Sequence, residues 1–263
     1  KPVLVACSII GAICSGLPAA SANTLAQVME QKLLRVAIDL NAPPYGMTDD
    51  KMNAIGSDVE TANLIADSLG VKLQIVPTTQ ANRIPFLLTN KADVVISSLS
   101  ITEERARVVD FTIPYADNKA VIAVPKDSPI KEMKDLVGKT VVTARGTTND
   151  QQVTKQAPPG TNIVRFENDA TAITAITSGQ SSIFATAPSI IGALNQKYPS
   201  KALDIRIVMS SAKLAFGVAK NNPEIKEKMN ELIRVNLKNG KLNAIYKKFH
   251  QTDLPADVVA LGD

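Results

Sequence analysis

The chain has 263 residues, of which 45% are hydrophobic and 21% are charged. This length can bury a substantial core in one or two domains, and the composition excludes a disordered protein. The formal net charge is +4, but Lys and Arg are spread along the chain without basic blocks. We therefore expect no nucleic acid among its partners.

The first 22 residues have the pattern of a secretory signal peptide. Lys1 precedes an apolar run over 3–17, and the small residues Ala20-Ser21-Ala22 predict cleavage after Ala22. The run is shorter than the ~20 residues that a membrane-spanning helix needs. We expect a signal peptide over 1–22 and a periplasmic protein. Leu4-Val5-Ala6-Cys7 also resembles a lipoprotein site, which we favour less because apolar sequence continues past Cys7.

The cysteines and the histidine narrow the possible chemistry. Cys7 and Cys14 both lie in the predicted signal peptide, so the mature chain would have no disulfide and no thiolate site. His250 is the single histidine, and we expect it on the surface at the end of a helix. Triad chemistry and histidine-ligated zinc are therefore disfavoured. We expect neither a cofactor nor a bound metal.

From residue 33, short β-rich runs alternate with helical patterns. The expected elements are strands over 33–38, 71–76 and 94–98 and helices over 57–69 and 84–88. Ser57 and Glu60 have the spacing of a capping box at the start of the first helix, and Gly70 is typical of a helix end. This alternation indicates a parallel sheet with helices on both faces.

After Pro114 the α/β alternation repeats, and the C-terminal part becomes helical. The expected elements are strands over 121–124, 140–144, 163–166, 183–185, 205–209 and 214–219 and helices over 130–136, 170–177, 190–194, 223–239 and 242–249. Two α/β units in one chain predict two lobes with a cleft between them, near the carboxyl ends of strands. One continuous doubly wound sheet is the alternative that periodicity leaves open.

One motif is specific enough to indicate a family. The segment 97–105, with Ser100-Ile101-Thr102-Glu103-Glu104-Arg105, continues through Val109-Asp110-Phe111-Thr112 to Pro114-Tyr115. It resembles the signature of family 3 bacterial solute-binding proteins, the periplasmic receptors for polar amino acids. Further landmarks of the family follow the same order here, and they are Asp39 with Pro44-Tyr45, Gly56 with Asp58-Val59-Glu60, 90–93, Gly146-Thr147-Thr148, 216–219 and 239–249.

The resemblance implies a fold and a function. The fold would be α/β, periplasmic-binding-protein-like type II, with two α/β lobes joined by a two-strand hinge. Lobe 1 would span 31–116 plus 216–263 and lobe 2 would span 117–215, closing around a ligand like a clam shell. The implied function is that of the substrate-binding component of an ABC importer. It would bind an amino acid or a related small carboxylate and dock on the transporter's membrane subunits, as a monomer without enzyme activity.

Arg105 is the strongest candidate for contact with the ligand. Its guanidinium can hold a carboxylate through two parallel hydrogen bonds, which a lysine cannot reproduce. In the family, the matching arginine holds the ligand's α-carboxylate. The alternative for Arg105 is a surface salt bridge with Glu104 or Asp110.

Two further groups match family positions that bind the ligand. Ser98 and Ser100 follow a strand and would meet the carboxylate and the amine, although serines also cap strand ends. Gly146, Thr147 and Thr148 form a turn at an expected helix start, where backbone N–H groups can bind an anion.

The sequence also departs from the family where the ligand's amine should bind. Family receptors carry an aspartate there, whereas this chain has Ala187 after Thr186. A buried ammonium without an anion costs on the order of several kcal/mol. Either another carboxylate replaces the aspartate, with Asp39 and Asp117 as candidates, or the ligand lacks a free α-amine.

The pocket is also expected to be less aromatic than usual. Ala42 and Gln80 occupy positions where the family often has aromatic side chains. Tyr45 would form one wall of the pocket or belong to the core. The candidate ligand-binding residues are Asp39, Tyr45, Gln80, Ser98, Ser100, Arg105, Asp117, Gly146, Thr147, Thr148, Thr186 and Ala187.

Two other functions stay open. A few relatives are periplasmic dehydratases of prephenate-like acids, and Asp39, Asp117 and Glu167 are conceivable acids or bases. Nothing in the sequence pairs them. A soluble sensory protein that binds a ligand and reports to a membrane partner is the other alternative.

Overall fold

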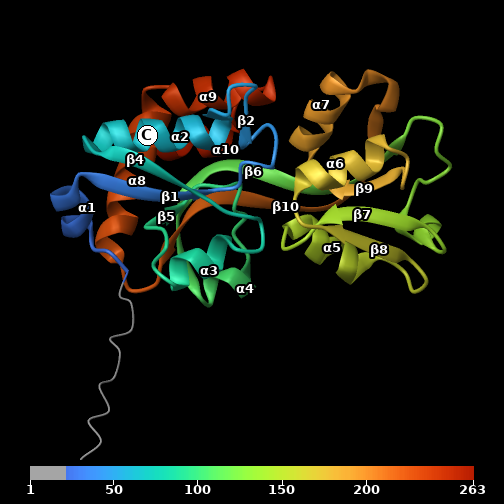
Figure 1. Ribbon diagram of the computed structural model, residues 1–263, viewed down its shortest axis with the longest axis horizontal. Helices are drawn as coiled ribbons and strands as arrows, with labels where there is room; N and C mark the ends of the chain where they lie inside the picture. The colour runs from blue at the N-terminus through green and yellow to red at the C-terminus, as the bar shows by residue number, and fades with distance from the viewer. Residues whose placement is uncertain (1–21) are drawn as a thin grey trace, which may run out of the picture.

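The computed structural model describes residues 22–263. They form two α/β halves that share two long strands (Figure 1). Nearly all of the predicted signal peptide lies outside the described residues. We call the half that carries the described N-terminus and the C-terminus lobe 1, and the half formed by the middle of the chain lobe 2.

Lobe 1 is built on three parallel strands in the order β4-β1-β5. Helices α2 and α9 lie on one side of this sheet, and α3 and α4 lie on the other (Figure 1). Helix α8 packs into the same hydrophobic core as α2. The element bounds are α1 Leu25–Gln31, β1 Leu33–Ile38, β2 Met47–Thr48, β3 Ala54–Ile55, α2 Ser57–Leu69, β4 Lys72–Pro77, α3 Arg83–Leu88, β5 Val94–Val95, α4 Glu103–Ala106, α8 Pro223–Lys238, α9 Lys241–His250 and α10 Ala256–Val259.

Lobe 2 repeats this architecture with parallel strands in the order β9-β7-β8. Helix α5 lies on one side of the sheet, and α6 and α7 lie on the other (Figure 1). The element bounds are a 3₁₀ turn at Met133–Leu136, β7 Thr140–Ala144, α5 Thr148–Gln156, β8 Asn162–Phe166, α6 Asp169–Thr177, β9 Ile183–Thr186 and α7 Pro188–Lys197. Apolar side chains from both sheet faces, such as Phe184 and Val141, are fully buried in this lobe.

Strands β6 (Val109–Pro125) and β10 (Leu203–Ala219) run through both lobes. They pair with each other antiparallel along their length. In lobe 1, β10 also pairs with β5, and in lobe 2, β6 also pairs with β9. The result is one hydrogen-bonded sheet in which these two strands form the shared hinge. The predicted two-lobed α/β fold with a two-strand hinge is confirmed. The boundaries near residues 116 and 216 fall inside the shared strands and stay our proposal for where the lobes divide.

Three local predictions were wrong for identifiable reasons. The runs 205–209 and 214–219 belong to one strand, because the polar Ser210 and Ser211 between them stay paired with β6. The strand expected over 94–98 ends at Val95, before a turn in which Ser98 has a φ of 42°. The capping box is absent: Gly56 is the N-cap of α2, and the Ser57 hydroxyl bonds His250 instead.

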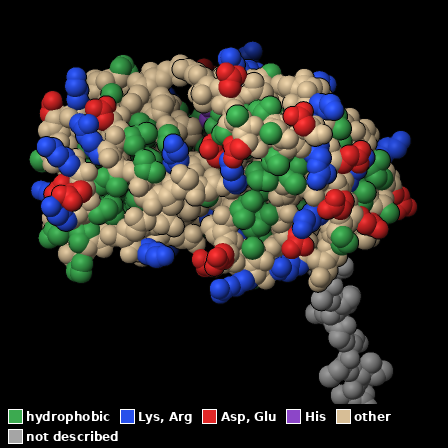
Figure 2. All heavy atoms as spheres, turned by 180° about the vertical axis from the view of Figure 1, so that it is seen from behind, with side chains coloured by type: hydrophobic (Ala, Val, Ile, Leu, Met, Phe, Trp, Pro, Cys, Tyr) green, Lys and Arg blue, Asp and Glu red, His purple; other side chains and the backbone are tan. Residues whose placement is uncertain are grey.

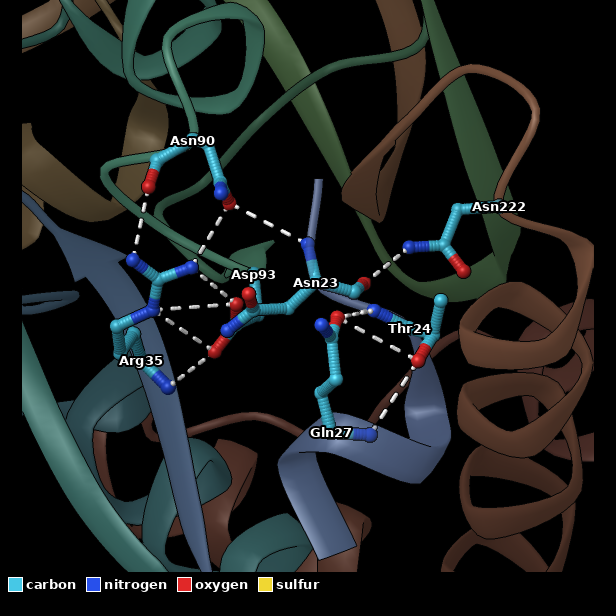
Figure 3. Close-up of polar contacts among 7 residues, drawn as sticks. All are labelled: Asn23, Thr24, Gln27, Arg35, Asn90, Asp93 and Asn222. Atoms are coloured by element: carbon cyan, nitrogen blue, oxygen red, sulfur yellow. Dashed lines mark hydrogen bonds and ion pairs between the residues drawn. The ribbon is translucent and has the colours of Figure 1, made fainter. Parts of the chain in front are cut away.

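A polar network connects β1, the turn before β5 and the first described residues of lobe 1 (Figure 3). Arg35 pairs with the fully buried carboxylate of Asp93 at 2.6 Å and also donates to the backbone carbonyl of Asn90. Asn23 in turn donates its backbone N–H to the Asn90 side chain, and Asn222 donates to the Asn23 carbonyl. The family landmark at 90–93 therefore has a structural role in holding β1, β5 and the first described residues together.

None of the helices within residues 22–263 is long and apolar enough to cross a lipid bilayer. Acidic and basic side chains are interspersed over the face shown in Figure 2. The charge therefore does not gather into a single-sign surface on that face.

Candidate ligand-binding cleft

A cavity lies between the two lobes and is partly open to solvent. Its walls come from segments that follow strands of both sheets, as expected for an α/β sheet. Lobe 1 and the hinge contribute Tyr45, Gln80, Arg83, Ser98, Ser100 and Asn118, and lobe 2 contributes Thr147, Thr148, Asn149, Asp169, Ala187 and Ile190.

The lobes meet at Gly146, whose carbonyl oxygen accepts two hydrogen bonds from lobe 1. Arg105 Nη2 lies 3.1 Å from this oxygen and Arg83 Nη2 lies 3.3 Å from it. Gly146 has a φ of 73°, and a Cβ atom at this position would lie 2.8 Å from the Cα atom of Ala81. The backbones of the two lobes therefore approach too closely here for any side chain other than hydrogen.

Two more contacts across the cleft complete a closed arrangement. The Ser189 hydroxyl donates to the Tyr45 hydroxyl at 2.8 Å, and the Ala170 N–H donates to the Asn41 carbonyl at 2.9 Å. Tyr45 is buried and lines the cavity as well. It is thus both a wall residue and a partner in the closed contact between the lobes.

Arg105 is held in place by its own helix and by lobe 2. The Thr102 hydroxyl caps α4 by accepting the Arg105 N–H, and Arg105 Nη1 donates to the Ser100 carbonyl at 2.9 Å. Neither acidic neighbour pairs with it, because Glu104 accepts from Gln151 and Asp110 pairs with Lys220. Burial lowers the pKa of Arg105 to about 10, against the opposing effect of Glu104. The surface salt bridge considered for Arg105 is therefore not formed.

Arg83 is a second cleft arginine, and it was not among the candidate ligand-binding residues predicted from the sequence. Its side chain is 2% exposed and donates to the backbone carbonyls of Gln80 and Ser97 in addition to Gly146. Burial and the neighbouring Arg105 lower its pKa to about 9. Within residues 22–263, no carboxylate lies within 4.0 Å of either cleft guanidinium. The two cations are thus hydrogen-bonded but have no direct counter-ion.

Two buried carboxylates lie near Arg83 without pairing with it. Asp39 follows β1 and accepts the Asn41 N–H, but its Oδ2 atom has no hydrogen-bond partner, and burial raises its pKa. Asp169 is the first residue of α6, and its Oδ1 atom is likewise without a partner. Burial, with a smaller effect of Asp39, raises the pKa of Asp169 to about 7. Sequence reasoning missed Asp169 because an acidic first helical residue usually serves the helix itself.

Ser98 owes its position in the cavity wall to a third buried carboxylate. Asp58, at the start of α2, accepts the Tyr115 hydroxyl at 2.9 Å and the backbone N–H of Ser98. Ser98 has a positive φ of 42°, a conformation that is strained for a residue with a side chain. Burial raises the pKa of Asp58 to about 6. The landmarks around 58 and 115 therefore support the turn that presents Ser98 and Ser100.

The structure brings most of the candidate residues together. Seven of them line the cavity directly, and they are Tyr45, Gln80, Ser98, Ser100, Thr147, Thr148 and Ala187. Arg105 and Gly146 bond to each other at its edge. Thr186 is fully buried behind Ala187 with its hydroxyl unpartnered. Asp117 is not in the wall: its neighbour Asn118 is, because successive side chains of a strand point to opposite faces.

His250 lies at the end of α9, as expected, but it is partly buried rather than on the surface. Its ring stacks on Tyr246 with centroids 4.2 Å apart and lies 4.9 Å from the ring of Tyr45. Its Nε2 atom bonds the Ser57 hydroxyl, and burial lowers its pKa to about 4. His250 thus supports the cleft from behind Tyr45. The described residues contain no cluster of three or more His, Cys, Asp or Glu side chains that could hold a metal ion.

Residues 34–252 match the sequence profile of the family described as bacterial extracellular solute-binding proteins, family 3. This chain belongs to that family. The glutamine-binding protein of Geobacillus stearothermophilus is 32% identical over 186 residues, which cover 69% of this chain and 71% of the relative. The glutamine-binding protein of a Bacillus subtilis ABC transporter is 27% identical over 260 residues, or 97% of this chain and 94% of the relative.

Solved structures agree with this assignment. A mutant of ArgBP from T. maritima superposes with a TM-score of 0.79 at 36% identity, covering 86% of this chain and 99% of that one. The solute receptor for L-cysteine of Neisseria gonorrhoeae gives a TM-score of 0.81 at 28% identity, covering 86% and 93%. The chain is therefore a solute-binding protein by sequence and by fold.

Proposed function

We propose that this chain is the periplasmic substrate-binding component of an ABC importer and that it binds an amino acid or a related small carboxylate between its lobes. The family assignment supports the solute-binding role, and several relatives are named as amino-acid-binding proteins. The bound, closed form would be the one that docks on the membrane subunits of the transporter.

The observation that carries the proposal is the pair of buried guanidinium groups at one cavity. A buried charge without a counter-ion is costly, and the lowered pKa values of Arg83 and Arg105 express that cost. An anionic ligand would supply the missing charge. Arg105 also has the planar geometry that suits a carboxylate.

The opposite lobe offers a second set of donors to the same anion. Helix α5 begins beside the cavity with Thr147 as its N-cap, and Thr148 and Asn149 follow in its first turn. The first backbone N–H groups of a helix have no partner within the helix and favour negative charge. A carboxylate held by Arg105 from lobe 1 and by α5 from lobe 2 would hold the two lobes closed.

Isothermal titration calorimetry with the twenty protein L-amino acids, L-cystine and small organic acids tests this proposal. We expect at least one carboxylate to bind, and Arg105→Ala to weaken that binding by roughly 100-fold or more, since a charged partner is removed from a buried site. Arg107→Ala is the matched control, because Arg107 is exposed and two residues away. Unchanged affinity in Arg105→Ala would contradict the carboxylate site.

The dehydratase alternative has one observation in its favour. The cyclohexadienyl dehydratase of Pseudomonas aeruginosa is 32% identical over 136 residues, but these cover only 50% of this chain and 51% of that enzyme. Incubation of the purified protein with prephenate or arogenate distinguishes the two functions. We expect no turnover, and rapid product formation would replace the transport proposal by an enzymatic one.

A further inference from the structure

Asp169 is the feature of the cleft that a carboxylate ligand alone does not explain. Among the described residues that line the cavity, it is the only acidic one. Its side chain is 2% exposed, and its Oδ1 atom has no hydrogen-bond partner. A buried carboxylate oxygen without a donor is costly, so a donor from outside the described chain is expected to meet it.

The surroundings of Asp169 do not provide that donor. The charged groups close enough to affect it are Asp39 at the end of β1 and Arg83 on α3, and Tyr45 is the nearby hydroxyl. Arg83 directs its N–H groups to the carbonyl oxygens of Gln80, Ser97 and Gly146 rather than to Asp169. Asp39 is itself an acceptor with an unpartnered oxygen. The two carboxylates therefore form a negative region, and of the two it is Asp169 that reaches the cavity wall, which Arg83 also lines.

This region lies beside the position where the family resemblance leads us to expect an anion. Ala187, which stands there, lines the same cavity and is the N-cap of α7, while Asp169 is the first residue of α6. Both residues follow strands of lobe 2, β9 and β8 respectively. Lobe 2 thus has no acidic side chain at Ala187, where the family has one, but has one at Asp169 in the same cavity wall.

We propose that Asp169 is the cation-binding group of this cleft and that the ligand is a carboxylate with a free amino group. The ammonium group donates to Asp169 Oδ1 while the carboxylate binds Arg105. This inference rests on the proposed function and specifies its substrate class. It replaces Asp117, which is not in the cavity wall, as the substitute for the missing family aspartate, and it assigns Asp39 a supporting negative charge.

Calorimetry with paired probes tests the role of Asp169. The probes are the L-amino acid that the wild type binds most tightly and the acid that lacks only its α-amino group. We expect the wild type to prefer the amino acid by roughly 100-fold or more, and Asp169→Asn to reduce this preference below about 10-fold, because a buried ion pair is lost. Glu167→Gln, an exposed change two residues earlier in the same loop, should leave the preference intact.

A measurement on the wild type avoids any effect of substitution on folding. Because the pKa of Asp169 is raised to about 7, an arriving ammonium group must displace a proton from part of the molecules. Titrations of the same amino acid at pH 7 in phosphate and in Tris should differ in enthalpy by an amount that corresponds to release of about half a proton. The deaminated acid should show no such release.

The possible results separate the two proposals. Retention of the amino-acid preference in Asp169→Asn, or equal binding of both probes by the wild type, overturns the inference while leaving the carboxylate site intact. Equal proton release on binding of the amino acid and of the deaminated acid overturns it as well. Failure of every amino acid and organic acid to bind the wild type overturns the proposed function and this inference together.

Discussion

At the scale of single residues, Gly146 links closure of the lobes to recognition. Its carbonyl oxygen is the common acceptor for both cleft arginines, and its α-carbon faces Ala81 of the other lobe. The two lobes therefore meet at a backbone contact that leaves no room for a side chain at position 146. The same glycine also needs a positive φ, so two separate physical demands apply to it.

Substitution of Gly146 by alanine should separate these demands. We expect Gly146→Ala to weaken binding of the preferred amino acid by about 10-fold or more, because the new Cβ atom opposes closure, and to lower stability by about 1 kcal/mol through backbone strain. Gly138→Ala is the matched control: Gly138 has a φ of 70° with no atom near its Cβ position. It should show the loss in thermal unfolding without the loss in calorimetric affinity. Equal affinity losses would contradict the closure argument.

The residues of the cleft also show what a sequence can and cannot predict. The motif around Arg105 and the landmark at Gly146-Thr147-Thr148 predicted residues that the structure brings to one cavity, among them Ser98, Ser100 and Thr147. Arg83 and Asp169 were not predicted, because they lie 86 positions apart and neither belongs to a local pattern that indicates a ligand. The shared strands β6 and β10 and the contacts across the cleft bring their lobes together.

At the scale of elements, local periodicity predicted the buried helices and strands well and the hinge poorly. Helix α2 and strand β1 are buried along a regular stripe and were predicted with their observed bounds. The 17-residue strand β10 was predicted in two pieces and β6 only over 121–124, because only the ends of these strands lie in a lobe core. Between the cores, side chains such as Lys119 and Ser211 are exposed, and pairing rather than burial defines the strand.

The Arg35–Asp93 pair is the element-level contact whose removal should cost most stability. Asp93 is fully buried and also accepts the Arg35 backbone N–H at 2.8 Å, so it joins β1 to the turn before β5. Asp93→Asn would leave Arg35 without its counter-ion, and we expect a loss of about 3 kcal/mol in the free energy of unfolding measured with urea.

A surface pair supplies the control for this change. Lys228 and Glu231 pair on the exposed side of α8, and Glu231→Gln should change stability little. Because Arg35 lies near the start of β1 and Asp39 follows its end, Asp93→Asn should also leave ligand affinity unchanged. A loss of affinity without a loss of stability would contradict the assigned structural role.

At the scale of the whole molecule, two compact lobes share little beyond the hinge and a charged cleft. The cleft between them holds buried arginines and carboxylates, and the ligand that we propose would carry a partner for each charge. Register shifts between β6 and β10 occur at several points, including Leu214 to Gly217 where β10 enters lobe 1. Irregular pairing of this kind weakens the ladder locally, so we expect lobe movement to concentrate there.

Two ionisable groups, Asp58 and His250, should also make the stability of the molecule depend on pH, and their contributions change in opposite directions as pH rises. Burial raises the folded-state pKa of Asp58 from 3.8 to about 6, so the folded state holds an extra proton between these values, and this contribution to stability is lost as pH rises. Burial lowers the pKa of His250 from 6.5 to about 4, so its contribution is present above pH 6.5 and is lost as pH falls.

Between pH 4.5 and 5.5 the two groups act in opposite directions, each by about 1 kcal/mol per pH unit. Urea unfolding at several pH values in this window should therefore show that His250→Gln makes stability fall more steeply as pH rises. Asp58→Asn should make the same profile flatter or reverse it. Slope changes of the same sign in the two buried variants would show that burial does not control these protons.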